Sequence, residues 1–325
     1  MSAYILPAIQ YVLAGTPTVL AGCAAFGLHE AVEAYKIHRQ SLEHFAGMSQ
    51  PTQYPYLIHI GGTGDVGRKP DDSFSFTCLE KLTLKPMGFP KEHVCSLSQN
   101  SKAENRPNKS FYSLSTEEYL TVVKQRAKEF LKEVTSNTEE NIDLIITGLS
   151  QGGAIAAQLA DSLLKDPDIG HKINRLLLIP IHATLKGSTA NFWPKWMRDY
   201  LIRFFYPFPV IKEFHRDSDF LKNNRTAIHV LRDMNPRVAI HPVHDGVDPY
   251  VLAAHGYAKN NSARWDQILA IALPMLAVSL MFDLPLAGPL LLMAILAGLW
   301  NHILGVNTPK IGAHINDFMR DKKIK

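Results

Sequence analysis

One pentapeptide in the middle of the chain has the composition of a catalytic turn. Residues 148–152 read Gly-Leu-Ser-Gln-Gly, which matches the pattern Gly-x-Ser-x-Gly. The apolar run 144–147 before it predicts a buried strand, and the small residues after it favour a helix. A serine held in a strained strand-to-helix turn presents its hydroxyl as a nucleophile, and the flanking Gly148 and Gly152 leave room for the crowded backbone. The sequence therefore predicts a nucleophile elbow with Ser150 at its tip.

The same pentapeptide also fits an ordinary strand–turn–helix joint, because glycine and serine are common in turns. A second glycine-rich loop earlier in the chain favours the chemical interpretation. Residues 56–65 read Tyr-Leu-Ile-His-Ile-Gly-Gly-Thr-Gly-Asp, a buried strand followed by glycines, without the Lys-Ser/Thr ending of a phosphate loop. We expect this loop to supply one oxyanion donor, the backbone N–H of Gly62 or Thr63, and Gln151 to supply the other.

The overall composition is that of an ordinary globular protein. The chain has 325 residues, of which 46% are hydrophobic and 20% charged, and its net charge is +4. This length is enough for one large α/β domain with additions. No basic block or stripe indicates a nucleic-acid partner. Three cysteines, Cys23, Cys78 and Cys95, lack CxxC or Cys/His spacing, which argues against a disulfide framework and a structural zinc site.

Apolar residues are concentrated in two segments, the first at the N-terminus. Residues 4–28 contain no charged side chain and are long enough to cross a hydrocarbon layer of ~30 Å as a helix. A cleaved signal peptide would begin with a positive charge, which residues 1–4 lack, and the lipobox-like run that ends at Cys23 is followed by apolar residues. We expect a retained anchor helix within residues 1–50, followed by basic residues that place the rest of the chain on the cytoplasmic side. A buried hydrophobic helix is the alternative.

The second apolar segment spans residues 267–304 and carries a single charge, Asp283. Proline and glycine between 285 and 289 divide it into two arms, each short for a membrane crossing. We expect a helical hairpin that dips into one leaflet or forms a hydrophobic lid, with a buried core hairpin as the alternative. Residues 183–222 are rich in aromatic side chains and predict a lid-like insertion or, alternatively, a plain helical connection.

The rest of the chain alternates strand and helix patterns. Residues 115–118, Ser-Thr-Glu-Glu, form a capping box that begins an amphipathic helix ending near Thr135. Apolar runs predict further strands at 93–97, 173–181, 226–231 and 238–243. This alternation predicts an α/β fold with a mostly parallel sheet flanked by helices.

The order of these features resembles the α/β-hydrolase superfamily over roughly residues 52–182 and 225–325. The segment His-Asp-Gly-Val-Asp-Pro-Tyr-Val at 244–251 is similar to the family's His-Gly-x-x-Asp-Pro-x-Val, which implies Asp248 as the triad acid. The segment Gly-Ala-His at 312–314 is similar to the family's Gly-x-His, which implies His314, just before the last helix, as the base. Asp245, Asp233 and His255 are the alternatives for these two roles. The insertion 267–304 is not a general feature of the family.

The resemblance implies a Ser-His-Asp mechanism in which Ser150 attacks an ester or thioester carbonyl, with no metal and no organic cofactor. Together with the apolar segments, it predicts a membrane-associated serine hydrolase, such as a lipase, phospholipase, esterase or acyl-thioesterase, acting on a lipid or acyl-ester substrate. In this interpretation residues 51–325 form the hydrolase domain. Two alternatives are a catalytically inactive membrane-binding or scaffold protein on the same fold and a soluble esterase whose hairpin caps an acyl pocket.

Overall fold

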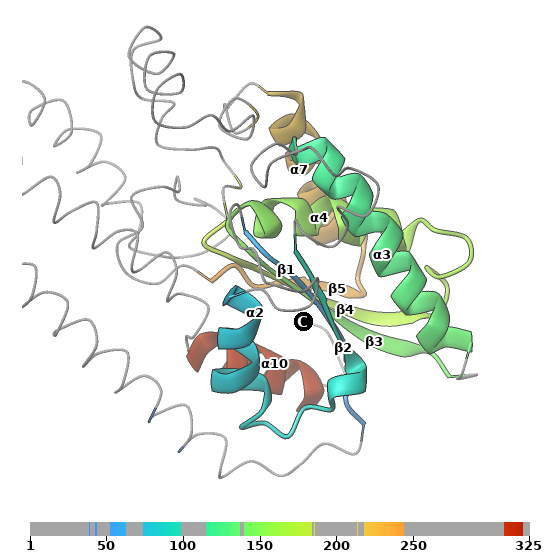
Figure 1. Ribbon diagram of the computed structural model, residues 1–325. Coiled ribbons are helices and arrows are strands. Elements are labelled where there is room, and N and C mark those ends of the chain that lie inside the picture. The colour runs from blue at the N-terminus through green and yellow to red at the C-terminus, as the bar shows by residue number, and fades with distance from the viewer. Residues whose placement is uncertain are drawn as a thin grey trace, which may run out of the picture.

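The structure is a computed structural model, and Figure 1 shows its arrangement. It describes the ranges 53–62, 74–98, 115–136, 140–183, 218–243 and 309–320, together with Arg39, Glu43, Leu185 and Glu213. The following predictions concern residues outside this part: the anchor at 4–28, the hairpin at 267–304, nearly all of the insertion at 183–222, and the roles of Thr63, Asp245, Asp248 and His255. Among the helices in the described ranges, none has the length and apolar character that a membrane crossing requires.

The described strands form one parallel sheet of five strands in the order β2-β1-β3-β4-β5. Their bounds are Tyr56–Ile60 (β1), Val94–Leu97 (β2), Ile142–Leu149 (β3), Ile173–Ile181 (β4) and Val238–Ile240 (β5). Parallel strands that are covered on both faces are apolar nearly throughout, as β3 and β4 are. The predicted α/β fold with a parallel sheet is therefore confirmed.

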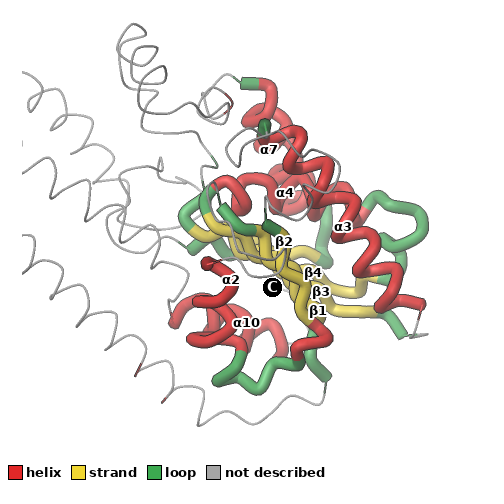
Figure 2. The backbone as a smooth tube through the Cα atoms, viewed as in Figure 1, coloured by secondary structure: helices red, strands yellow, loops and turns green. Residues whose placement is uncertain are grey.

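Helices cover both faces of this sheet (Figures 1 and 2). One face carries α3 (Thr116–Ser136), α4 (Gln151–Leu164) and α7 (Asp219–His229), and the other carries α2 (Phe74–Leu79) and α10 (Pro309–Arg320). Successive strand residues point to opposite faces, so Ile146 packs in the core under α3 and α4, whereas Ile145 packs in the core with α2 and α10. Short helical segments complete the described part: η1 (Glu80–Leu84), η2 (Lys91–His93) and η4 (Val230–Met234).

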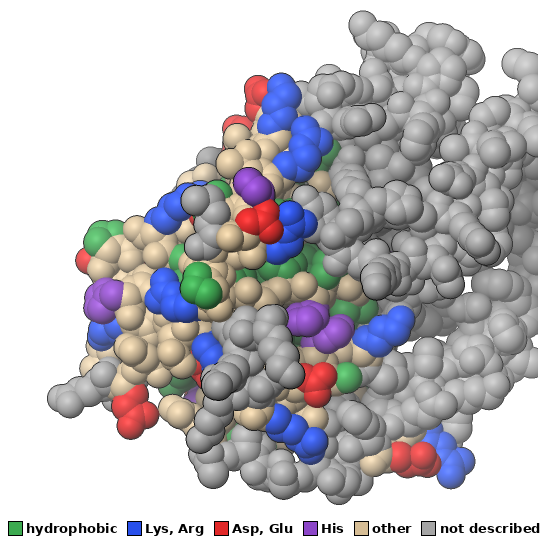
Figure 3. All heavy atoms as spheres, turned by 180° about the vertical axis from the view of Figure 1, so that it is seen from behind, with side chains coloured by type: hydrophobic (Ala, Val, Ile, Leu, Met, Phe, Trp, Pro, Cys, Tyr) green, Lys and Arg blue, Asp and Glu red, His purple; other side chains and the backbone are tan. Residues whose placement is uncertain are grey.

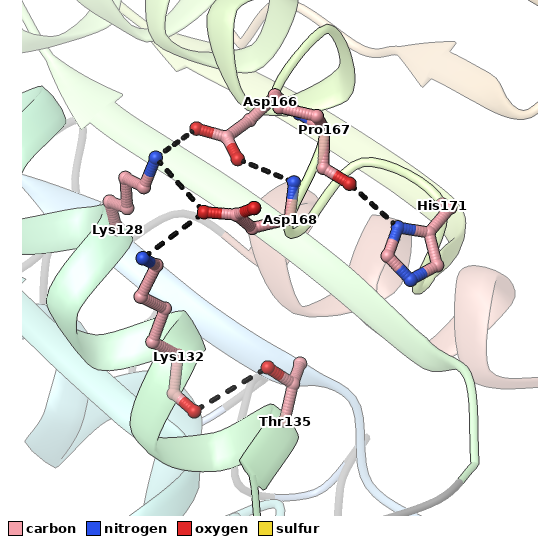
Figure 4. A network of polar contacts seen from close by, with 7 residues as sticks. All are labelled: Lys128, Lys132, Thr135, Asp166, Pro167, Asp168 and His171. Atoms are coloured by element: carbon pink, nitrogen blue, oxygen red, sulfur yellow. Dashed lines mark hydrogen bonds and ion pairs between the residues drawn. The ribbon is translucent and has the colours of Figure 1, made fainter.

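Helix α3 begins with the predicted capping box. The backbone N–H of Ser115 donates to Glu118 Oε2 at 3.0 Å, and the N–H of Glu118 donates to Ser115 Oγ at 3.1 Å. The two reciprocal bonds satisfy N–H groups that have no acceptor inside the helix. At its other end, Lys128 and Lys132 reach Asp166 and Asp168 in the turn after α4, so the two helices are also joined at their surface (Figure 4).

One of the predicted strands is a helix, and one helix was not predicted. Residues 226–231, predicted as a strand, belong to α7 and η4. The reason is that Ser218 caps α7 by accepting a hydrogen bond from Leu221 N at 3.2 Å, and the apolar residues that follow are buried at helical spacing against α4. Helix α2 was not among the elements predicted from the sequence, because its six residues are too few to show a periodicity.

One face of the described part carries side chains of both charges. Figure 3 shows Lys and Arg side chains interspersed with Asp and Glu on the face turned away from the view of Figure 1. This distribution agrees with the modest net charge of +4.

Candidate active site

Ser150 occupies a strained turn between β3 and α4. Its backbone has φ 53° and ψ −115°, in the positive-φ region that residues other than glycine rarely adopt. The turn is fixed on both sides, because Ser150 N donates to Ile181 O at 2.8 Å and Ala154 N donates to Ser150 O at 3.1 Å. The Ser150 side chain does not cap α4. The backbone therefore has the strand–turn–helix geometry that the pentapeptide predicts, whereas the catalytic role of Ser150 stays a prediction.

The glycines around Ser150 are required by close backbone packing. A Cβ atom on Gly148 would lie 2.5 Å from the carbonyl carbon and oxygen of Gly152. A Cβ atom on Gly152 would lie 2.2 Å from Ile60 O and 2.5 Å from Gly61 O. Helix α4 thus begins directly against the end of β1, an approach that no larger residue would permit.

The glycine-rich loop after β1 lies beside the serine. A Cβ atom on Gly62 would lie 3.3 Å from Ser150 Cβ and 3.1 Å from Leu149 O. Gly61 N donates to Leu97 O at 2.8 Å, which anchors the loop on the neighbouring strand β2. The structure therefore brings Gly62 and Gln151, two of the predicted site residues, next to Ser150.

Two buried residues of α3 contact this site, and sequence reasoning assigned them no role there. Gln151 Nε2 donates to Thr116 Oγ1 at 3.1 Å. The Tyr119 hydroxyl lies 3.1 Å from Gly61 O and 3.2 Å from Leu97 O, in position to donate to either. In the sequence these residues are visible only as members of the buried face of an amphipathic helix.

Sequence reasoning also gave no role to His182. Among the described residues other than glycine, His182 and Ser150 have a positive φ, and that of His182 is 45°. It is fully buried and follows Ile181, whose carbonyl accepts the hydrogen bond from Ser150 N. Its own N–H donates to Val243 O at 2.9 Å. A second strained residue therefore lies where β3, β4 and the chain after β5 meet, and nothing in the sequence pattern signals it.

His314, the predicted base, lies inside α10 rather than before it. The helix begins at Pro309, a residue type suited to the first helical turn, so the expectation of a histidine just ahead of the last helix is wrong. The His314 ring stacks on that of His241, with 4.6 Å between centroids. Burial lowers the pKa of His314 and so does the nearby His241, while Asp317 acts in the opposite direction.

The strand register shows where this histidine pair lies. His241 N donates to Leu178 O, and Val243, two residues further, pairs with Ile181 at the level of the serine turn. The strand β5 lies two strands from β3, and His241 stands three residues short of the position level with Ser150 along the strand direction. From the usual spacing and rise of strands, the two backbones are therefore about 14 Å apart. The described contacts of His314 join it to His241 and not to Ser150.

Of the three acid candidates, the structure describes Asp233. Its carboxylate is exposed and bound by Arg232, with 2.6 Å between Nε and Oδ1, and by His229. The hydrogen bond from Arg232 is the main reason that the pKa of Asp233 is lowered to about 2. Asp233 precedes β5, so it lies at the amino end of a parallel strand, whereas Ser150 follows the carboxyl end of β3. The structure does not bring Asp233 and Ser150 together.

The fold and this turn define an α/β protein with a strained serine at the carboxyl edge of a parallel sheet. No model of a known protein family matches the sequence, and no curated protein matches it. Among solved structures, phospholipase PlaB from Legionella pneumophila is similar over 65% of this chain, with 12% identity and a TM-score of 0.38. This chain spans 42% of the length of that phospholipase. An esterase from Pyrobaculum calidifontis is similar over 77% of this chain and 94% of its own, with 15% identity and a TM-score of 0.31.

Proposed function

We propose that this chain is a serine hydrolase that cleaves carboxylic esters or thioesters through an acyl-enzyme. The observation that carries the proposal is Ser150 at φ 53° between β3 and α4, with the backbone of Gly62 packed against its side chain. A strained serine in this setting is a costly arrangement for a plain joint, and strained residues cluster at functional sites.

The geometry supports the following mechanism. The Ser150 hydroxyl attacks the carbonyl carbon while a histidine takes its proton, and the carbonyl oxygen becomes negatively charged. The N–H groups of Gly62 and Gln151 stabilise this oxygen, because they come from the loop and the helix start that adjoin Ser150. The N-terminus of α4 adds a partial positive charge. The histidine passes its proton to the departing alcohol or thiol as the bond between it and the carbonyl carbon breaks, which leaves the acyl group on Ser150. Water, deprotonated by the same histidine, then attacks the acyl-enzyme and releases the carboxylic acid and the free Ser150 hydroxyl.

The acid and the base complete the proposal. Val243 pairs with Ile181 at the carboxyl edge of the sheet, and an extended chain spans at most ~3.6 Å per residue, so Asp245 and Asp248 are both within reach of that edge. Asp248 is the acid that the family resemblance implies. The family resemblance also implies His314 as the base. Since the His314 ring stacks on His241 rather than on Ser150, the histidines between Val243 and α10 are the alternative bases. These are His244, His255 and His302.

Lipid-like substrates and a membrane location are part of the proposal. Residues 4–28 and 267–304 are the apolar segments that support it, and the basic residues after the first favour a hydrolase domain on the cytoplasmic side. Docking beside a bilayer raises the effective concentration of a bilayer substrate. Deletion of residues 268–303, bridged by a short linker, should release the protein from vesicles more than it lowers hydrolysis of a short water-soluble ester. Loss of short-ester hydrolysis in a folded deletion variant would instead make this segment part of the site.

Labelling by a fluorophosphonate probe tests the proposed function. The native chain should be labelled and Ser150→Ala should not. Ser136→Ala, at an exposed serine at the end of α3, is the matched control and should be labelled like the native chain. Absence of labelling in a folded native protein supplied with lipid vesicles would contradict the proposal and favour a non-catalytic membrane-binding protein.

The same probe identifies the base and the acid. Alanine is placed singly at His314, His255, His302 and His244, and asparagine singly at Asp248 and Asp245. The base and acid variants should lose labelling, whereas the other variants should keep the rate of the native chain. Asp233→Asn is the control, because its carboxylate lies at the amino end of β5.

A further inference from the structure

We propose that the first turn of α3 positions both donors of the oxyanion hole, through Tyr119 on one side and Thr116 on the other. This inference rests on the proposed function, since it concerns how Gly62 N–H and Gln151 N–H are held. Tyr119 and Thr116 do not touch the reacting atoms in this proposal and act only through Gly61 and Gln151.

Tyr119 fixes the direction of the Gly62 N–H. The Gly61 carbonyl and the Gly62 N–H belong to the same peptide unit, which is planar, and the described residues contain no cis peptide. In a trans peptide the C=O and the N–H point in opposite directions. The Tyr119 hydroxyl, 3.1 Å from Gly61 O, therefore orients the Gly62 N–H as well. Tyr119 is fully buried. Its hydroxyl also lies 3.2 Å from Leu97 O, which accepts the Gly61 N–H, so both acceptors of this hydroxyl hold the Gly61 residue in place.

Thr116 fixes the second donor. Gln151 follows the serine and begins α4, and its side-chain amide donates to Thr116 Oγ1 at 3.1 Å. Both residues are fully buried. A buried amide that loses its acceptor is costly, so this hydrogen bond holds the first residue of α4 against α3.

One rigid turn thus holds both contacts. Residues three apart in a helix lie on the same face, which puts Thr116 and Tyr119 side by side. The turn is itself fixed, because the Ser115–Glu118 capping box closes it and Thr116 N donates to Glu213 Oε2 at 2.7 Å. The carboxylate also favours the positive end of the helix dipole. The spacing between the two oxyanion donors is therefore set by side chains of a single helical turn.

The test compares Tyr119→Phe and Thr116→Val with the native enzyme in hydrolysis of a short water-soluble ester. Each variant removes one hydroxyl and keeps the shape of the side chain. We expect kcat to fall about tenfold with KM nearly unchanged, less than the ~10²–10³-fold loss that removal of a whole oxyanion donor causes. Affinity for a boronic acid, whose tetrahedral adduct carries the negative charge, should fall in parallel. Thr116→Ser retains the hydroxyl and should restore kcat.

Matched controls separate positioning from general loss of stability. Tyr54→Phe removes another tyrosine hydroxyl bound to a backbone carbonyl, that of Met87 at 3.0 Å, and Thr135→Val changes a buried threonine at the far end of α3. Both should keep the native kcat. If Thr116→Val does not fold, Gln151→Met removes the same hydrogen bond from the side of α4 and should also lower kcat.

Two results would overturn the inference while leaving the hydrolase intact. In the first, the Tyr119 and Thr116 variants keep the native kcat and boronate affinity. In the second, they lose no more activity than controls of equal stability. A native protein that folds but neither hydrolyses the ester nor reacts with fluorophosphonate would overturn the proposed function itself.

Discussion

The imidazole of His59 is hydrogen-bonded across the sheet to the hydroxyl of Thr147, with 2.9 Å between Nδ1 and Oγ1. The two residues are paired partners on β1 and β3. The other ring nitrogen lies 2.8 Å from Ser75 Oγ in α2, so one buried side chain joins the helix to two strands. Burial lowers the pKa of His59 to about 3.

We expect His59 to make the fold acid-sensitive. Its pKa is about 3 in the folded chain and ~6.5 in the unfolded chain, so between these values the unfolded state binds more protons. The contribution of neutral His59 to the free energy of unfolding is therefore fully present above pH ~6.5. Below that pH the free energy of unfolding falls by up to about 1.4 kcal/mol per pH unit. Urea unfolding at several pH values should show a flatter dependence in His59→Gln. His171→Gln, at an exposed histidine, should retain the native slope, and equal slopes for the His59 variant and the native chain would refute this prediction.

Two glycines of the site should respond differently to alanine. In Gly152→Ala the new methyl would meet two backbone carbonyl oxygens at 2.2 and 2.5 Å, so we expect destabilisation by about 3 kcal/mol or more. In Gly62→Ala the nearest atoms are at 3.1 and 3.3 Å, so the variant should fold with a loss of about 1 kcal/mol and a clearly lower kcat. Urea unfolding and ester hydrolysis measure both effects. A stable Gly152→Ala protein would show that α4 and β1 are not packed as described.

Arg175 should hold the end of α10 on the sheet. Its Nε donates to Asp143 Oδ2 and its Nη1 to Phe318 O, each at 3.0 Å, and its guanidinium lies over the Phe318 ring. Lysine lacks the planar guanidinium group whose several N–H donors make these contacts at the same time. Arg175→Lys should therefore lower the stability by about 1–3 kcal/mol and the hydrogen-exchange protection of α10 more than that of β3. Arg237→Lys, which alters a similar contact to Ile173 O, should leave α10 unchanged, and equal loss in both helix and strand would argue against a local role.

Replacement of the serine should separate strain from chemistry. Glycine adopts φ 53° without cost, whereas alanine retains the cost of about 1 kcal/mol or more that the strained backbone carries. Both Ser150→Gly and Ser150→Ala should be inactive. In urea unfolding we expect Ser150→Gly to be the more stable of the two, although its more flexible unfolded chain offsets part of the gain. An alanine variant as stable as the glycine variant would mean that the turn is not strained.

The features that were predictable from sequence are those that local chemistry determines. The capping box at Ser115 and Glu118, the apolar strand β3 and the glycines around Ser150 each have a signature within a few residues. Residues 226–231 were assigned wrongly because a short apolar run suits either a strand or a helix, and packing of α7 against α4 decided between them.

The remaining parts of the site depend on contacts between distant segments. Tyr119 meets Gly61 and Thr116 meets Gln151 only after the sheet and α3 have come together, so no local pattern reveals these pairs. The position of His314 relative to His241 likewise depends on how α10 packs beneath the sheet.

The parallel arrangement of the strands also has a kinetic consequence. The contact between His59 and Thr147 joins positions 88 residues apart, and Arg175 and Phe318 are separated by 143 residues. Contacts at such separations form slowly, because a long loop must close before they contribute any stability. The serine turn depends on them, since Gly62 and Ser150 become neighbours only when β1 and β3 pair. During refolding, the proposed esterase activity should therefore return later than helical circular dichroism.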